Sequence, residues 1–196
     1  ATHREDASLV LLPKLMPAYA GLQLEEEIKN LSHAFKEPKH PFLFILGGAK
    51  FSTKMPLIEK YLKLADHVFI GGALANDFLK ARGYEVGKSL VDETDYNLGE
   101  IIKNKKLILP IDVVVVGAGN KNGFVKPIQM IGKNDRIVDI GPATILRFSE
   151  FIRSAKTIVW NGPMGAFEHH PFSHGSIALS RFIAARASGK AYGVVG

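Results

Sequence analysis

The stretch Phe42-Leu43-Phe44-Ile45-Leu46-Gly47-Gly48-Ala49-Lys50 decides the fold, because five apolar residues lead directly into glycines. The same change from apolar to small residues recurs at 67–73 and at 157–165. Buried parallel strands are such apolar runs, and open α/β sheets bind ligands at the carboxyl ends of their strands. A turn without side chains lets backbone N–H groups approach a phosphate closely. Three such turns predict a site for a phosphorylated ligand.

Segments with the patterns of strands and helices alternate from Phe42 onward. Such alternation is typical of right-handed βαβ crossovers. We therefore expect an α/β fold, a Rossmann-like three-layer lobe with a six-stranded, mostly parallel sheet. Residues 117–133 are predicted to form a loop or a short hairpin. The expected strands are 42–46, 67–71, 112–116, 136–140, 157–160 and 191–195, and the expected helices are 52–64, 74–82, 95–104, 142–155 and 174–187.

The first 37 residues have a different character. The segment 1–21 does not have the pattern of a domain start. Residues 22–37 are predicted to form a connecting helix, which Pro38 and Pro41 end because proline removes a backbone donor. Residues 38–196 then form the main lobe, which we expect to be incomplete at its C-terminus because the last strand stops at Gly196.

Composition and charge restrict the class of partner. The 196 residues include 25 basic and 19 acidic side chains, a net charge of +6, but no basic run with interleaved aromatic residues. We therefore expect a small anionic ligand and no nucleic acid. No apolar stretch reaches membrane-spanning length, and the absence of cysteine fits a cytoplasmic setting. We thus expect no membrane partner.

The histidines are the residues that most resemble a metal-binding site, but their pattern is weak evidence for one. His170 and His174 have the spacing of metal ligands on a helix, yet Pro171 lies between them and disfavours a continuous helix there. We interpret these two and His169 as surface loop histidines and expect no metal site.

Two cations and one carboxylate accompany the glycine turns. Lys50 and Lys54 are four residues apart, which would place both ammonium groups on one helix face beside the first turn. The alternative is two solvated lysines. Glu168, after the third turn, is either an acceptor for ribose hydroxyls or an exposed loop acid. For the second turn, close ligand approach and tight packing of helix on strand remain equally open.

These segments, in this order, resemble phosphoglycerate kinase. The resemblance also includes Leu109-Pro-Ile-Asp-Val-Val114, Asp139-Ile-Gly-Pro142, Gly83-Tyr-Glu-Val-Gly-Lys-Ser-Leu90 and Thr2-His-Arg4. It covers essentially the whole chain. It identifies residues 1–21 with the end of the phosphoglycerate-binding lobe, 22–37 with the inter-lobe helix, and 38–196 with the nucleotide-binding lobe.

The resemblance implies reversible phosphoryl transfer between ATP and the carboxylate of 3-phosphoglycerate in glycolysis, with Mg²⁺, by a monomer. The metal-orienting aspartate is expected beyond Gly196, and 3-phosphoglycerate would bind mainly through the N-terminal lobe, so we expect this chain alone to be inactive. By resemblance, Lys50 meets the transferred phosphoryl group, Lys54 contacts nucleotide phosphates, and Arg4 belongs to the phosphoglycerate site. The nucleotide-binding residues implied in this way are Gly48, Ala49, Lys54, Gly71, Gly72, Ala73, Leu90, Asn161, Pro163, Gly165, Ala166 and Glu168.

Two other interpretations remain open. A non-catalytic nucleotide-binding module could use the same lobe, whereas a dinucleotide-binding domain would require an intact GxGxxG motif, which the sequence lacks. One departure from the family also predicts a backbone conformation. Ala73 stands where a third glycine is commoner, so we expect a negative φ at this residue.

Overall fold

The computed structural model describes residues 5–92, 96–117 and 122–196. The chain divides into two compact units, Ala1–Lys36 and Glu37–Gly196. Among the described residues, no helix combines the length and the apolar character needed to cross a membrane. The second unit contains the three glycine turns.

The first unit consists of short helices followed by one long helix. These are α1 (Ala7–Val10), α2 (Leu12–Leu15) and α3 (Leu22–Lys36), and α3 confirms the predicted helix. Many of its apolar side chains are exposed, including Leu15, Tyr19 and Leu22. The identification of this unit with the end of another lobe and an inter-lobe helix stays a prediction.

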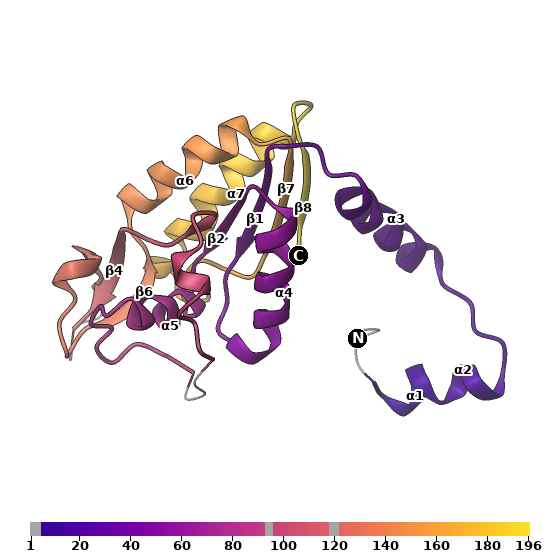
Figure 1. The fold of residues 1–196 in the computed structure, drawn as a ribbon, viewed down its shortest axis with the longest axis horizontal. Coiled ribbons are helices and arrows are strands. Elements are labelled where there is room, and N and C mark those ends of the chain that lie inside the picture. The colour runs from indigo at the N-terminus through magenta and orange to yellow at the C-terminus, as the bar shows by residue number, and fades with distance from the viewer. Residues whose placement is uncertain (1–4, 93–95, 118–121) are drawn as a thin grey trace. The chain divides into compact units, whose positions relative to one another are not determined.

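A five-stranded parallel sheet is the centre of the second unit (Figure 1). Its strands are β1 (Phe42–Leu46), β2 (His67–Ile70), β3 (Leu107–Ile108), β7 (Thr157–Asn161) and β8 (Tyr192–Val195). Their spatial order is β3-β2-β1-β7-β8, and every neighbouring pair is parallel. The predicted α/β fold with a mostly parallel sheet is therefore confirmed.

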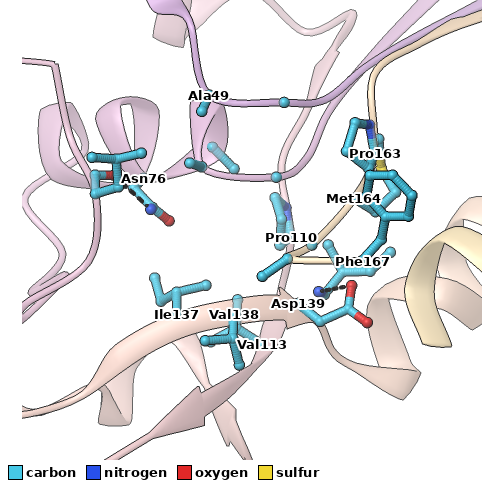
Figure 2. A pocket seen from close by; sticks show the side chains of 18 of the residues that line it. Ala49, Asn76, Pro110, Val113, Ile137, Val138, Asp139, Pro163, Met164 and Phe167 are labelled. Atoms are coloured by element: carbon cyan, nitrogen blue, oxygen red, sulfur yellow. Dashed lines mark hydrogen bonds between the residues drawn. The ribbon is translucent and has the colours of Figure 1, made fainter. Parts of the chain in front are cut away.

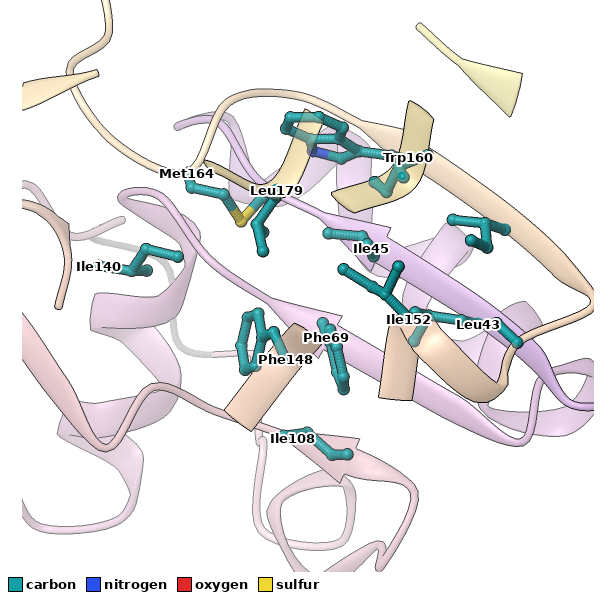
Figure 3. Packing of buried hydrophobic residues seen from close by; sticks show 13 residues of the cluster. Leu43, Ile45, Phe69, Ile108, Ile140, Phe148, Ile152, Trp160, Met164 and Leu179 are labelled. Carbon is teal, nitrogen blue, oxygen red and sulfur yellow. The ribbon is translucent and has the colours of Figure 1, made fainter. Parts of the chain in front are cut away.

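Helices cover both faces of this sheet. On one face, α6 (Pro142–Ser154) and α7 (His174–Ala187) pack on alternate residues of the strands, and Figure 3 shows Phe148 of α6 lying on Phe69 of β2. The two rings are stacked with their centroids 4.0 Å apart. On the other face, Tyr61 of α4 (Phe51–Leu64) stacks on Phe44 of β1. All five residues of β1 are buried, and each fully buried side chain of this size contributes about 1.5–3 kcal/mol.

The strands predicted at 112–116 and 136–140 exist, but they do not belong to the parallel sheet. With β5 (Phe124–Pro127), β4 (Asp112–Val116) and β6 (Arg136–Ile140) form a separate antiparallel sheet in the order β5-β4-β6. A parallel neighbour requires a helical crossover, and the described part of 117–135 contains β5 and the 3₁₀ turn Ile128–Met130 instead. The predicted count of six strands in one sheet is therefore wrong, whereas the predicted short hairpin is confirmed.

The helix predicted at 95–104 is also absent. Among its described residues, 96–104, only Ile101–Lys103 is helical, as a 3₁₀ turn. Asn97 has φ +43°, the left-handed region, which interrupts a right-handed helix. The helix predicted at 74–82 is confirmed as α5 (Leu74–Ala81), and the irregular segment that follows α5 takes the place of the helix predicted at 95–104.

Asp112 attaches the antiparallel sheet to the first turn of α6. Its carboxylate accepts hydrogen bonds from the Ala143 N–H at 3.0 Å and from the Thr144 N–H at 2.7 Å. The Thr144 hydroxyl donates to the same carboxylate at 2.6 Å. A carboxylate at a helix N-terminus satisfies N–H groups that have no partner within the helix. Gly141 leaves the space that this carboxylate occupies, because an added Cβ would overlap it.

Candidate functional site

The three glycine turns lie at the carboxyl ends of β1, β2 and β7 and are joined to one another by backbone hydrogen bonds. The Gly48 N–H donates to the Pro163 carbonyl at 2.9 Å, and the Gly72 N–H donates to the Met164 carbonyl at 3.0 Å. The Leu74 N–H in turn donates to the Gly48 carbonyl at 2.9 Å. The turns therefore form one connected edge rather than three separate loops.

Close approach of these backbones requires glycine at particular positions. Gly72 has φ +61°, and an added Cβ would lie 2.6 Å from the Gly48 nitrogen and 2.7 Å from the Pro163 oxygen. At Gly71, an added Cβ would overlap the sulfur of Met164, so this glycine serves packing. Ala73 has φ −63°, which confirms the expected conformation of the third residue of the turn.

The connected edge borders a cavity of about 520 Å³. Figure 2 shows the wall from β4 and β6 with Val113, Ile137 and Val138, and the part of the edge that the third turn forms with Pro163 and Phe167. Most of the predicted nucleotide-binding residues line it. These are Gly48, Ala49, Gly72, Ala73, Leu90, Pro163, Gly165, Ala166 and Glu168, and Lys50 lines it as well.

Three predicted residues lie behind the lining, and one lies outside the description. Gly71 is buried under Met164, while Lys54 and Asn161 pair with each other, the Lys54 ammonium donating to the Asn161 side-chain oxygen. Arg4 falls among residues 1–4, outside the described residues.

The two lysines differ in their environment. Lys50 is the last residue before α4 and has an extended backbone (φ −90°, ψ 93°), so the expected pair on one helix face is not formed. Its exposed side chain lines the cavity. Lys54 lies in the first turn of α4 and is half-buried, and burial lowers the pKa of its ammonium. Partial removal of a cation from water strengthens its attraction for a nearby anion.

The rim of the cavity carries exposed apolar side chains and one carboxylate. Leu90 is 60% exposed and Phe167 is 49% exposed, although both belong to the lining. Glu168 is exposed beside Phe167 and also lines the cavity. Exposed apolar side chains at the rim of a cavity are suited to cover an apolar surface of a ligand. The carboxylate can accept hydrogen bonds from hydroxyl groups of the same ligand.

Asp139 connects β6, the third turn and α7. It is buried and accepts hydrogen bonds from the Gly175 N–H and from the Ile140 N–H, each at 2.8 Å. Added Cβ atoms at Gly165 and Gly175 would overlap its carboxyl group. Burial raises the pKa of the Asp139 carboxyl to about 6, although the two N–H donors and the nearby His174 act in the opposite direction. Its hydrogen bond to Gly175 joins β6 to the first turn of α7, and Gly165 of the third turn packs against its carboxyl group.

Several lining residues were missed by the sequence reasoning. Asn76 and Leu79 of α5 were not singled out, and neither were Arg136, Ile137 and Val138 of β6. Asn76 could have been found, because it is a polar residue that follows the second turn on a helix otherwise rich in apolar residues, such as Leu74 and Phe78. The β6 residues carry no comparable signal, since an apolar strand is normally core.

The described residues contain no group of three or more histidine, cysteine or acidic side chains that could hold a metal ion. His170 and His174 lie with ring centroids 6.2 Å apart, and Pro171 falls in the 3₁₀ turn His170–Phe172.

The fold and the cavity define a class of protein: an α/β domain with a cavity at the carboxyl ends of parallel strands, bordered by glycine turns and by Lys50. Comparison with known proteins narrows this class. The sequence model of the family "Phosphoglycerate kinase" matches residues 1–196. The chain therefore belongs to the phosphoglycerate kinase family.

Individual relatives agree with this assignment. The phosphoglycerate kinase of Lactobacillus delbrueckii subsp. bulgaricus is 43% identical over 191 residues, covering 93% of this chain and 47% of the relative. That of Thermus thermophilus is 42% identical over 194 residues, covering 94% and 50%. The solved phosphoglycerate kinase of Coxiella burnetii superimposes with a TM-score of 0.81 at 38% identity, covering 90% of this chain and 47% of that one. The chain thus spans about half the length of the relatives it matches.

Proposed function

We propose that this chain is the nucleotide-binding part of a phosphoglycerate kinase, which transfers a phosphoryl group reversibly between ATP and the carboxylate of 3-phosphoglycerate. The observation that carries the proposal is the connected edge of three glycine turns, which borders one cavity together with Lys50. Family membership supports the reaction. Phosphoryl transfer needs positioning and charge neutralisation more than covalent help from the protein, and such an edge can supply both.

Different residues of the cavity would bind different parts of the nucleotide. The Lys50 ammonium and those backbone N–H groups of the turns that do not already donate within the edge would hold the phosphates, and Lys54, positioned by Asn161, would contribute a second positive charge. Glu168 at the rim would accept hydrogen bonds from the ribose hydroxyls. Apolar residues such as Leu90 would cover the base. Magnesium would enter bound to the phosphates of the nucleotide.

The remaining parts of the reaction involve the first unit. Arg4 would contact 3-phosphoglycerate, α3 would be the inter-lobe helix, and residues 38–196 would form the nucleotide-binding lobe. Monomeric state and a cytoplasmic location complete the proposal, which rests on family membership for these points.

Calorimetric titration of the chain with ADP tests the proposal. We expect saturable binding of one ADP per chain, and we expect Lys54→Met to weaken it about 10-fold to 100-fold. A hydrogen bond to a charged group contributes about 1.5–3 kcal/mol, and each 1.4 kcal/mol is tenfold in affinity. The control is Lys63→Met, which removes the same charge from the exposed last turn of α4. Absence of ADP binding, or equal weakening by both variants, would contradict the proposed site.

A further inference from the structure

Basic side chains gather at the amino ends of the five parallel strands. Because every neighbouring pair of strands is parallel, the segments that lead into the strands meet at one end of the sheet (Figure 1). The four residues that precede each strand contain eight lysine or arginine side chains and one acid, Asp66, whereas the whole chain has a net charge of +6. The excess positive charge is therefore concentrated in these five segments. The segments are 38–41, 63–66, 103–106, 153–156 and 188–191, and their basic residues are Lys39, Lys63, Lys103, Lys105, Lys106, Arg153, Lys156 and Lys190.

Acidic side chains of the protein neutralise little of this charge. Asp66 pairs with His40 at 2.6 Å and also accepts a hydrogen bond from the Phe42 N–H. Lys103 pairs with Glu100 at 2.8 Å. Within the described parts of the chain, the other seven basic residues of these segments form no ion pair. Most of these cations are therefore available to an anionic partner.

The stability of the helices explains only part of the cluster. Lys63 and Arg153 lie in the last turns of α4 and α6, where the helix dipole favours a cation. Four exposed lysines lie outside helices and have no such role in the fold, namely Lys39, Lys105, Lys156 and Lys190. We call these four lysines, with Lys63 and Arg153, the amino-end surface.

Backbone hydrogen bonds hold the segments of the amino-end surface beside one another. The Lys156 N–H donates to the Pro41 carbonyl at 2.9 Å, and the Tyr192 N–H donates to the Lys156 carbonyl at 2.8 Å. On the other side of β1, the Asp66 N–H donates to the Phe42 carbonyl at 2.9 Å. Neighbouring strands lie about 4.8 Å apart, so five strands extend over about 19 Å. The cations are thus attached to a fixed support, which lowers the entropy cost of binding a partner.

The amino-end surface lies at the opposite end of the strands from the glycine turns. None of its residues, all of which the structure describes, lines the cavity. We propose that the amino-end surface binds an extended acidic segment of a partner protein, independently of the nucleotide. An extended chain rises about 3.3 Å per residue, so about six residues of the partner would span the surface.

The composition of the five segments favours a protein partner over nucleic acid or lipid. Sites for single-stranded nucleic acid combine cations with aromatic side chains on which bases stack, and the segments contain no phenylalanine, tryptophan or tyrosine. Binding to a membrane surface uses an apolar face beside the cations. The segments, all of them described, have one exposed large apolar side chain, Leu64. Carboxylates require only a compact positive charge, which lysine supplies.

A fluorescence anisotropy titration with a labelled peptide of about six glutamates tests this binding in the unaltered chain. We expect saturable binding at low salt that weakens as salt is added, because the cations are exposed. A labelled oligothymidylate and vesicles of phosphatidylserine are compared under the same conditions. Absence of peptide binding, or tighter binding of the oligonucleotide or the vesicles, would overturn the proposal.

Two matched triple variants test where the peptide binds. Lys39→Gln/Lys105→Gln/Lys156→Gln should weaken peptide binding about tenfold, the combined effect of three exposed charge pairs. The control, Lys80→Gln/Lys88→Gln/Lys133→Gln, removes the same charge outside the five segments and should weaken binding less than about threefold, because salt screens distant charges. All six lysines are exposed, so both variants should fold, and the urea midpoint of tryptophan fluorescence checks this. Equal weakening by the two variants would show that only net charge matters and would overturn the proposal, while leaving the proposed function intact.

Discussion

Replacement of Gly72 by alanine should separate the three turns, and replacement of Gly83 provides a matched control. Both glycines have positive φ, +61° for Gly72 and +84° for Gly83. An added Cβ at Gly83 would meet nothing within 4 Å, whereas at Gly72 it would meet the backbone of Gly48 and Pro163 at less than 3 Å. The difference between the two variants therefore isolates the contact between the turns from the cost of the conformation.

The expected loss of stability follows from the backbone conformation and from the hydrogen bonds that would break. A side chain in the left-handed region costs about 1–2 kcal/mol, and both variants bear this cost. Gly72→Ala must in addition move the second turn away from the first and third, which are joined to it by the bonds Gly72–Met164 and Leu74–Gly48. Each such bond contributes about 1 kcal/mol net. We expect a loss of unfolding free energy of about 1–2 kcal/mol for Gly83→Ala and about 3–4 kcal/mol for Gly72→Ala.

Urea unfolding measures these losses through the single tryptophan. Trp160 is 6% exposed, and its ring nitrogen donates to the Gly162 carbonyl at 2.7 Å, so its fluorescence reports on the third turn. ADP affinity is measured on the same samples, and only Gly72→Ala should reduce it, by about tenfold or more for a distortion of about 1.4 kcal/mol. Equal losses of stability in the two variants would refute the claim that the turns depend on their mutual contact.

Two further perturbations test how the antiparallel sheet is held to the rest of the second unit. Asp139 has its pKa raised from 3.8 to about 6 by burial, so the stability that it contributes is fully present below about pH 4 and is lost as the pH rises through 6, by about 3 kcal/mol. Urea midpoints measured between pH 4 and 8 should show this fall in the unaltered chain and less of it in Asp139→Asn; parallel curves would contradict it. Asp112→Ala should lower the unfolding free energy by about 3 kcal/mol, because the Ala143 and Thr144 N–H groups lose their acceptor, and Asp112→Asn, which keeps one acceptor oxygen, should lose less. Equal losses in the two Asp112 variants would show that the carboxylate does not satisfy these donors.

The sequence predicted the parallel sheet because its strands are unbroken apolar runs followed by glycine. The five buried residues of β1 and the turn at Gly47 carry this signal by themselves. The partners of β4 and β6 were not predictable in the same way, because an apolar run such as Val113 to Val116 fits a parallel or an antiparallel neighbour equally well. Only the lack of a helical pattern in residues 117–133 pointed to the antiparallel hairpin.

The candidate site likewise contains residues that the sequence could predict and residues whose contacts only the structure shows. Residues of the glycine turns were predictable, since a turn without side chains has a clear physical use. The role of Lys54 needed the fold, because Asn161 lies 107 positions further along the chain and is brought beside it by the pairing of β1 with β7. The contact of Asn76 with Leu90 also needed the fold, because the sequence does not show that the Asn76 amide nitrogen donates to the Leu90 carbonyl.

The most direct test of the connected edge is a titration of the ¹⁵N-labelled chain with ADP, followed by the backbone amide resonances. We expect the largest shifts at Ala49, Lys50, Ala73 and Gly165, all saturating with one common dissociation constant, because the turns border a single cavity. Shifts confined to one turn, or different dissociation constants for different turns, would contradict a single phosphate-binding edge.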